Sequence, residues 1–230
     1  MTARHRARGL VRSITVPLLA VVTVAGVLVG VSSSAGASPS VVGGCTSRVA
    51  GLNAPNPITV AQANPQFSPC VFDRVSLADL NVTLVPGIPP LSGVNAQVHA
   101  VVSSSSFTDF GVVASTEAQT DAGRVQIIAP GLFLTATGVH SQAGVVLNSE
   151  CGGAANGDSW LGSLTINGHV IQLGNGPLTI PVGLRIVVYV NQQLHPSSHD
   201  VTQRALFIQF SDKRYSLVVG EAHAALACIG

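Results

Sequence analysis

The chain has 230 residues, of which 47% are hydrophobic and only 9% are charged, and it contains 24 glycines. This much apolar surface excludes a charge-rich disordered chain, and the length allows one large all-β domain or two small ones. Aromatic residues make up only 4% of the chain. The core must therefore be built from Val, Leu, Ile and Ala, which favours closely packed sheet layers over a ligand pocket lined with rings.

The first 37 residues have the parts of an export signal. A basic start with four arginines precedes an apolar run from Val16 to Val31, and Ala35-Gly36-Ala37 then supplies small residues for cleavage. The alternative is an uncleaved membrane anchor, because the apolar run is nearly long enough to span a bilayer. We predict cleavage between Ala37 and Ser38, so that the membrane is contacted only through the signal peptide before cleavage.

Removal of this signal changes the charge balance. Four of the eleven basic residues lie within it, so seven Lys and Arg remain against ten Asp and Glu, a formal charge of −3. A mature chain with this charge has no basic patch to follow a phosphate backbone, and we expect no nucleic-acid binding.

All four cysteines lie in the exported part of the chain, and an even number in an oxidising compartment indicates disulfides. Several pairings are compatible with the sequence. We favour Cys45–Cys70, which lie together near the N-terminus, and Cys151–Cys228, which bracket the most regular part of the chain. A cysteine-based metal site is disfavoured because no two cysteines have the spacing of a C-x-x-C motif.

Residues 38–90 are rich in Gly, Pro and Asn, as in Asn53-Ala-Pro-Asn-Pro57. Proline at this density interrupts helices and sheet ladders. We therefore predict a loop-rich arm held by its own cysteine pair, with at most one short strand or helical turn between Val71 and Val85. Asn81-Val-Thr83 matches a glycosylation sequon, which we interpret as a chance match.

From residue 91 onward strands dominate the pattern. Apolar residues alternate from Val94 to Val102, and a return strand reaches Ala118 with Phe110, Val112 and Ala114 facing inward. Turns are expected at 103–106, at 121–123, at Pro130-Gly131, and in the Gly- and Asn-rich stretch 152–157. No window with helical period occurs, and regularly spaced strands separated by turns predict an all-β sandwich.

The C-terminal third is the most strongly patterned part. Asn167-Gly168 separates two apolar runs and predicts a two-residue type I′ turn that sets Leu164 opposite Ile171. A face shared by Leu184, Ile186, Val188 and Val190 is expected in the next strand. The last strand is predicted to have one apolar face, with Glu221 and His223 on the other side. That face consists of Val218, Gly220, Ala222, Ala224, Leu226 and Cys228.

Candidate chemistry is sparse. His195, His199 and Asp200 form a weak candidate metal site, because a curled loop could gather three ligands, although a solvated turn is the simpler interpretation. Trp160 and Tyr189 could contribute to a sugar-binding platform, although a Trp beside a hairpin is more often edge packing.

No G-x-S-x-G elbow, paired carboxylates or cofactor motif is present, and we expect no cofactor. The alternative function is a small secreted hydrolase whose groups converge only in the folded chain. Its groups would be His99, Asp109 and a serine of residues 103–106.

Four stretches resemble the choice-of-anchor P family of surface proteins from high-GC Gram-positive bacteria. They are Ala129-Pro-Gly-Leu-Phe-Leu-Thr-Ala-Thr-Gly-Val139, Leu161-Gly-Ser-Leu-Thr-Ile-Asn-Gly168, Val188-Tyr-Val-Asn-Gln-Gln193, and Ser216-Leu-Val-Val-Gly-Glu-Ala-His-Ala224 followed by Cys228. The resemblance implies an exported β-rich domain without assigned catalytic residues, usually followed by an anchoring tail. The present sequence has no such tail after Cys228, so we expect a freely secreted protein or one held at the envelope by a partner.

Together these features predict a signal peptide at 1–37, a loop-rich segment at 38–90 and a two-layer antiparallel β-sandwich at 91–230. The expected function is that of a secreted, non-enzymatic binding or structural module of the cell envelope. Its partner would be a cell-wall polymer or an envelope protein.

Overall fold

A computed structural model describes residues 40–53, 58–64, 69–84, 94–111, 113–194, 197–211 and 215–229. The predicted signal peptide, with Ala35 and Ala37, lies outside these residues. The described part contains thirteen strands, all paired antiparallel, and no helix. It therefore also contains no helix long and apolar enough to cross a membrane.

The first sheet has six strands in the order β10-β11-β12-β13-β1-β2. In its interior, the C-terminal strand and the first strand of the described chain pair along almost their whole lengths. The bounds are β1 Ser40–Asn53, β2 Ile58–Ala63, β10 Leu178–Val182, β11 Ile186–Leu194, β12 Asp200–Phe210 and β13 Ser216–Ile229.

The second sheet has seven strands in the order β3-β4-β5-β6-β8-β9, with β7 also paired to β6. Strand β6 is long enough to pair with β7 along one part and with β8 along the other. The bounds are β3 Asp73–Leu84, β4 Val94–Asp109, β5 Val113–Ala129, β6 Leu132–Asn148, β7 Gly153–Trp160, β8 Ser163–Ile166 and β9 His169–Val170.

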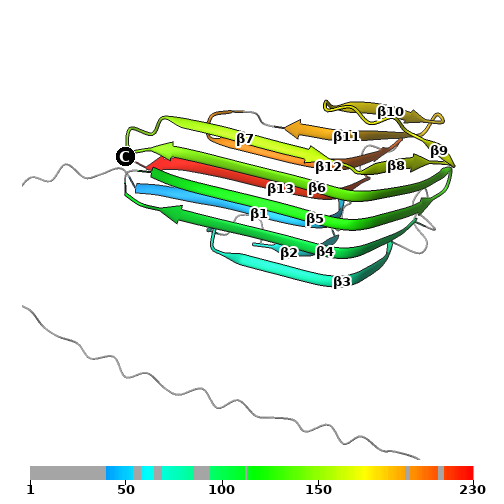
Figure 1. Cartoon of the computed structure of the whole chain (residues 1–230), viewed down its shortest axis with the longest axis horizontal. Helices are drawn as coiled ribbons and strands as arrows, with labels where there is room; N and C mark the ends of the chain where they lie inside the picture. The colour runs from blue at the N-terminus through cyan, green and yellow to red at the C-terminus, as the bar shows by residue number, and fades with distance from the viewer. Residues whose placement is uncertain are drawn as a thin grey trace, which may run out of the picture. The chain divides into compact units, whose positions relative to one another are not determined.

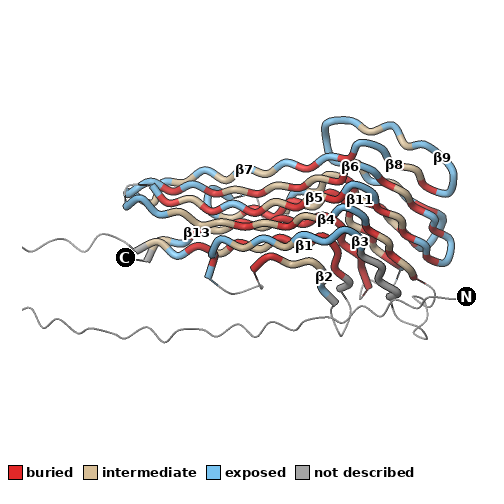
Figure 2. The backbone as a smooth tube through the Cα atoms, turned by 60° about the horizontal axis from the view of Figure 1, so that its bottom comes forward, coloured by how far each residue is buried: buried red, intermediate tan, exposed pale blue. Residues whose placement is uncertain are grey.

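The two sheets pack face to face and form the predicted all-β sandwich. Figure 1 shows β3 to β6 side by side in one layer, with β1, β12 and β13 in the other. Buried and more exposed residues alternate along the strands (Figure 2), because one face of each sheet points into the core.

The prediction of a loop-rich arm at 38–90 is wrong. This segment supplies β1 to the interior of one sheet, between β13 and β2, then β2 to its edge, and β3 to the edge of the other. The described strands β1, β2 and β3 contain no proline, so none interrupts their ladders. Proline density over the whole segment therefore does not exclude strands within it.

Three predicted turns are also wrong. Residues 103–106 lie within β4, residues 121–123 lie within β5, and most of the stretch 152–157 lies within β7. Serine and glycine occur in these strands because the packed faces accept small side chains, as shown by Ser103 and Ser105, which are almost fully buried. The turn at Pro130-Gly131 is confirmed, with a φ of 80° at Gly131.

A row of adjacent residues, left-handed on alternate strands, crosses each sheet and changes which side chains face inward. We call these rows the switch lines. One consists of Ala61, Val49, Gly220, Ala205 and Asn191, and the other of Ala78, Ala100, Gly123, Gly138 and Gly162. Positive φ occurs on alternate strands of each row, at Ala61, Gly220, Asn191, Ala100 and Gly138. The register on the two sides of each row stays the same, so these are not bulges with an inserted residue.

The switch lines explain where the predicted alternation fails. In β4 the buried positions change from Val94, Ala96 and Val98 to Val101 and Ser103, and Ala100 is exposed. In β13 Leu217 and Val219 enter the core before Gly220, whereas Ala222, Ala224 and Leu226 enter it afterwards. The prediction of a single apolar face for β13 is therefore wrong, because opposite sides of the strand face the core before and after Gly220.

Two further face predictions are wrong. Phe110 is 76% exposed because it lies in the connection after β4, although Ala114 is buried as expected and Val112 lies outside the described residues. Leu184 is fully exposed because it lies in the turn before β11, whereas Ile186, Val188 and Val190 form the expected buried face.

The hairpin at Asn167-Gly168 is confirmed. Both residues have positive φ, at 51° and 81°, as a type I′ turn requires. The amide of Ile171 donates a hydrogen bond to the carbonyl of Leu164 at 2.9 Å, so these two residues face each other as predicted.

Both predicted disulfides are present; one joins the two sheets, and the other joins β1 to the segment before β3. Cys45 of β1 is bonded to Cys70 just before β3, with their Cα atoms 5.0 Å apart. Cys151 in the β6–β7 turn is bonded to Cys228 of β13, with their Cα atoms 6.1 Å apart. The buried apolar residues form two clusters, a larger one made mostly of Val, Leu and Ile and a smaller one rich in alanine. Both disulfides pack with the smaller cluster, and the larger cluster has none.

Candidate functional site: the outer face of the second sheet

The strands β4 to β7 present a continuous row of polar side chains on their outer surface. Their inward neighbours, such as Ser103, Ala118 and Ala143, are buried, so the alternate positions face outward. We call this surface the polar face. It consists of Ser104, Ser106, Glu117, Gln119, Asp121, His140, Gln142, Asp158 and Trp160.

Three of these residues form a chain of contacts across neighbouring strands. The pairing register sets Asp121 opposite His140, and His140 opposite Trp160. Nδ1 of His140 lies 2.7 Å from Oδ1 of Asp121, and the imidazole stacks on the indole with ring centroids 5.3 Å apart and an interplanar angle of 22°. The indole is thereby held in one orientation while it remains 48% exposed.

Two glutamines of the polar face are held by carboxylates. Nε2 of Gln119 donates to Oδ2 of Asp121 at 2.7 Å, and Nε2 of Gln142 donates to Oε1 of Glu117 at 2.6 Å. These contacts order four side chains that would otherwise lose rotamer freedom when a ligand binds. Each amide also carries a second N–H and a carbonyl oxygen that can contact a ligand.

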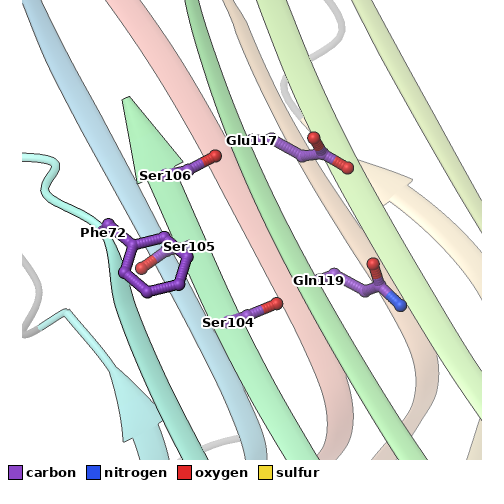
Figure 3. Close-up of a pocket in the computed structure, with 6 residues that line it drawn as sticks. All are labelled: Phe72, Ser104, Ser105, Ser106, Glu117 and Gln119. Carbon is purple, nitrogen blue, oxygen red and sulfur yellow. The ribbon is translucent and has the colours of Figure 1, made fainter. Parts of the chain in front are cut away.

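A shallow hollow of about 70 Å³ lies at the β3 side of the polar face. Figure 3 shows the Phe72 ring at one side of it, with Ser104 and Ser106 of β4 directed toward the side chains of Glu117 and Gln119. Phe72 is 79% exposed. The hollow is far smaller than a typical small-molecule pocket, so this surface suits an extended ligand better than an enclosed one.

The weak metal candidate is not assembled in the described part of the chain. Nε2 of His199 lies 3.1 Å from the carbonyl oxygen of Cys151, whereas Oδ1 of Asp200 lies 3.1 Å from Nε2 of His223. His195 lies outside the described residues. Among the described residues, no group of three or more His, Cys, Asp and Glu could hold a metal ion.

The residues suggested for a hydrolase do not converge. Nδ1 of His99 contacts Asp79 of β3, whereas Asp109 lies ten residues farther along β4 and accepts a hydrogen bond from the Gly111 amide. Ten residues of extended chain span about 33 Å. Ser103 and Ser105 face the core, so no nucleophile, base and carboxylate meet in this set.

Trp160 and Tyr189 do not share a platform. Trp160 lies on β7 of the second sheet, and Tyr189 lies on β11 of the first, where its ring packs against Phe207 with centroids 5.6 Å apart. The residues that do accompany Trp160 were not predicted as a site. Their signal in the sequence is the alternation of polar residues at Glu117, Gln119 and Asp121, but the turn predicted at 121–123 obscures it.

A buried ion-pair cluster lies on the first sheet, apart from the polar face. Glu221 of β13 contacts Arg48 of β1 and Arg204 of β12, which flank it in the register. Burial by itself raises the pKa of the Glu221 carboxyl, but the charges of Arg48 and Arg204 and their hydrogen bonds outweigh it and hold this pKa below its usual value. The carboxylate is therefore a structural anion in the middle of the sheet.

No protein-family model, curated protein or solved structure matches the chain.

Proposed function

We propose that the mature chain is a secreted, non-enzymatic binding module of the bacterial cell envelope, and that the polar face is its binding surface. The observation that carries the proposal is the Asp121–His140–Trp160 chain, in which an exposed indole is held by a stacked imidazole and a carboxylate. Ordered, exposed aromatic and amide side chains are typical of binding surfaces, because little conformational freedom remains to be lost.

Three further features support an extracellular role. The two disulfides are compatible with an oxidising compartment. The first 37 residues have the features of an export signal, and four stretches of the sequence resemble exported surface proteins of high-GC Gram-positive bacteria.

The test is co-sedimentation with an insoluble envelope. The full-length chain is expressed with its own leader in a high-GC Gram-positive host, purified from the medium, and mixed with washed envelopes of that host. We expect saturable co-sedimentation and an N-terminus at Ser38 by mass spectrometry. A protein that stays in the supernatant at every envelope concentration would refute the binding role, and an intact leader in the membrane fraction would refute secretion.

A further inference from the structure

We propose that the polar face binds a neutral glycan chain that lies across strands β4 to β7 and stacks on Trp160. This inference rests on the proposed function, because it names the chemical class of the ligand for the same surface.

The polar groups suit a polyhydroxylated ligand. Gln119 and Gln142 are fixed through their Nε2 atoms on Asp121 and Glu117, at 2.7 Å and 2.6 Å, which leaves donors and acceptors side by side on neighbouring strands. A sugar hydroxyl both donates and accepts hydrogen bonds, so it matches amide and carboxylate groups presented at strand spacing. Ser104 and Ser106 extend the same chemistry toward β3 (Figure 3).

The aromatic residues suit the apolar C–H face of a sugar ring. The indole of Trp160 lies over Gly138, a residue of the second switch line. A Cβ atom placed on Gly138 would lie 3.2 Å from Cζ3 of the indole. Glycine at this position therefore lets the ring lie close to the sheet, where His140 stacks against it and about half of its surface remains exposed. Burying half-exposed indole surface under a ligand is favourable, and the orientation of the ring is already fixed.

The charge of the surface selects among glycans. Glu117, Asp121 and Asp158 carry three carboxylates, whereas the exposed arginines of the neighbouring stretches, Arg74 on β3 and Arg124 on β5, number two. Like charges across an interface disfavour the wrong partner. Anionic polymers that carry phosphate or uronate groups would therefore be repelled, and a neutral chain is the matching ligand.

The dimensions fit a chain and not a single sugar. Phe72 precedes β3 and Trp160 ends β7, and these two strands are separated by β4, β5 and β6. Four strand intervals correspond to about 19 Å. An oligosaccharide of several rings could therefore contact both aromatic residues, whereas the hollow of about 70 Å³ is too small to enclose a free small molecule.

Trp160 makes the test direct, because it is the single tryptophan of the chain. Intrinsic fluorescence of the disulfide-bonded protein is titrated with N-acetylchitohexaose and cellohexaose as neutral probes, and with polygalacturonate as an anionic one. We expect a saturable change in emission with at least one neutral probe and none with polygalacturonate. Stronger binding of polygalacturonate than of both neutral probes would overturn the charge selection and with it the proposal.

Calorimetry on variants then locates the site. Gln142→Ala and His140→Ala are expected to weaken binding of the responding probe about tenfold or more, which is the size of a moderate interface contact. Phe133→Ala is the matched control, because Phe133 is a 42% exposed aromatic residue of β6 on the other side of the switch line. Equal losses in all three variants would place the ligand elsewhere and refute the proposal.

Envelope binding separates the two proposals. If the chain co-sediments and periodate oxidation of the envelope glycans abolishes binding, the glycan assignment is supported. If binding instead survives periodate but is lost after protease treatment of the envelope, the partner is a protein, so the glycan assignment fails while the binding function stands. Failure to co-sediment at all, without any fluorescence response, would overturn both.

Discussion

Oε1 of Glu221 lies 2.7 Å from Nε of Arg48 across the β1–β13 pair, and both side chains are more than four-fifths buried. Arg204 contacts the other carboxylate oxygen from β12, so one anion pairs with two guanidinium groups in the interior of the sheet. Removing one member of a buried pair leaves an uncompensated charge, which is far more costly than losing an exposed pair.

We therefore expect Glu221→Gln to lower the free energy of unfolding by about 3–5 kcal/mol. Since the pKa of Glu221 in the folded chain lies below its ordinary value of 4.5, the stabilisation is present above that pH and is lost as the pH falls through the folded pKa. Urea titrations at decreasing pH should show a steeper acid loss for the unmodified chain than for Glu221→Gln. Glu150→Gln, at an exposed turn, is the control and should change stability by less than about 0.5 kcal/mol.

Gly220 should not tolerate a side chain. Its φ is +67°, and an added Cβ atom would lie 3.1 Å from Cβ of Ala205 and 3.1 Å from Cγ1 of Val139 on the facing sheet. We expect Gly220→Ala to lower the free energy of unfolding by about 1–3 kcal/mol in urea denaturation. Gly44→Ala on the adjacent strand is the control, because no atom lies within 4 Å of its Cβ position. Equal effects of the two substitutions would show that the switch line is not a steric constraint.

The switch lines also explain what could be predicted from the sequence. Period-two alternation correctly indicates strands wherever the chain lies on one side of a line, as from Val94 to Val98 or from Ile186 to Val190. It fails across Ala100 and Gly220. At each of these residues the left-handed backbone changes which alternate residues face the core, from even to odd numbers or the reverse, while the strand register stays the same. The local sequence pattern does not indicate this change of the buried face, because the switch lines are defined only by the pairing of strands that are distant in sequence.

The candidate site was hidden for a related reason. The Asn167-Gly168 hairpin and both disulfides could be predicted because turn chemistry and cysteine position are local signals. Asp121, His140 and Trp160 are instead brought together by the register of β5, β6 and β7. The turn signal of Asp121-Ala-Gly123 predicts an interruption of β5, and with β5 interrupted the sequence does not predict this register.

Leu184 is expected to be dispensable for stability. It is fully exposed in the turn before β11, although the sequence places it in phase with the buried face of that strand. Leu184→Ser should therefore change the free energy of unfolding by less than about 0.5 kcal/mol. Leu164→Ala, at a fully buried position of β8, should lower it by about 2–5 kcal/mol in the same urea titration. A large loss from Leu184→Ser would contradict its assignment to the turn.

The two disulfides should contribute unequally to stability. Cys151 and Cys228 are separated by 77 residues, and Cys45 and Cys70 by 25. The loop-closure model assigns about 4.5 kcal/mol to the longer loop and about 3.5 kcal/mol to the shorter one. Thermal unfolding monitored by circular dichroism should thus show a greater loss of Tm for the Cys151→Ala/Cys228→Ala double variant than for Cys45→Ala/Cys70→Ala.

The surroundings of the two bonds narrow this difference without reversing the order. Cys45 is 1% exposed and Cys70 is 5% exposed, and both belong to the smaller core cluster, whereas Cys151 lies in a turn at the surface. Replacing the buried pair by alanine also removes two sulfur atoms from the core, which adds a cavity cost to the lost cross-link. Serine variants at Cys151 and Cys228, compared with the alanine variants, separate the contributions, because the more exposed positions should tolerate the hydroxyl. If the Cys45→Ala/Cys70→Ala variant is the less stable, packing in the alanine-rich cluster outweighs loop length in this fold.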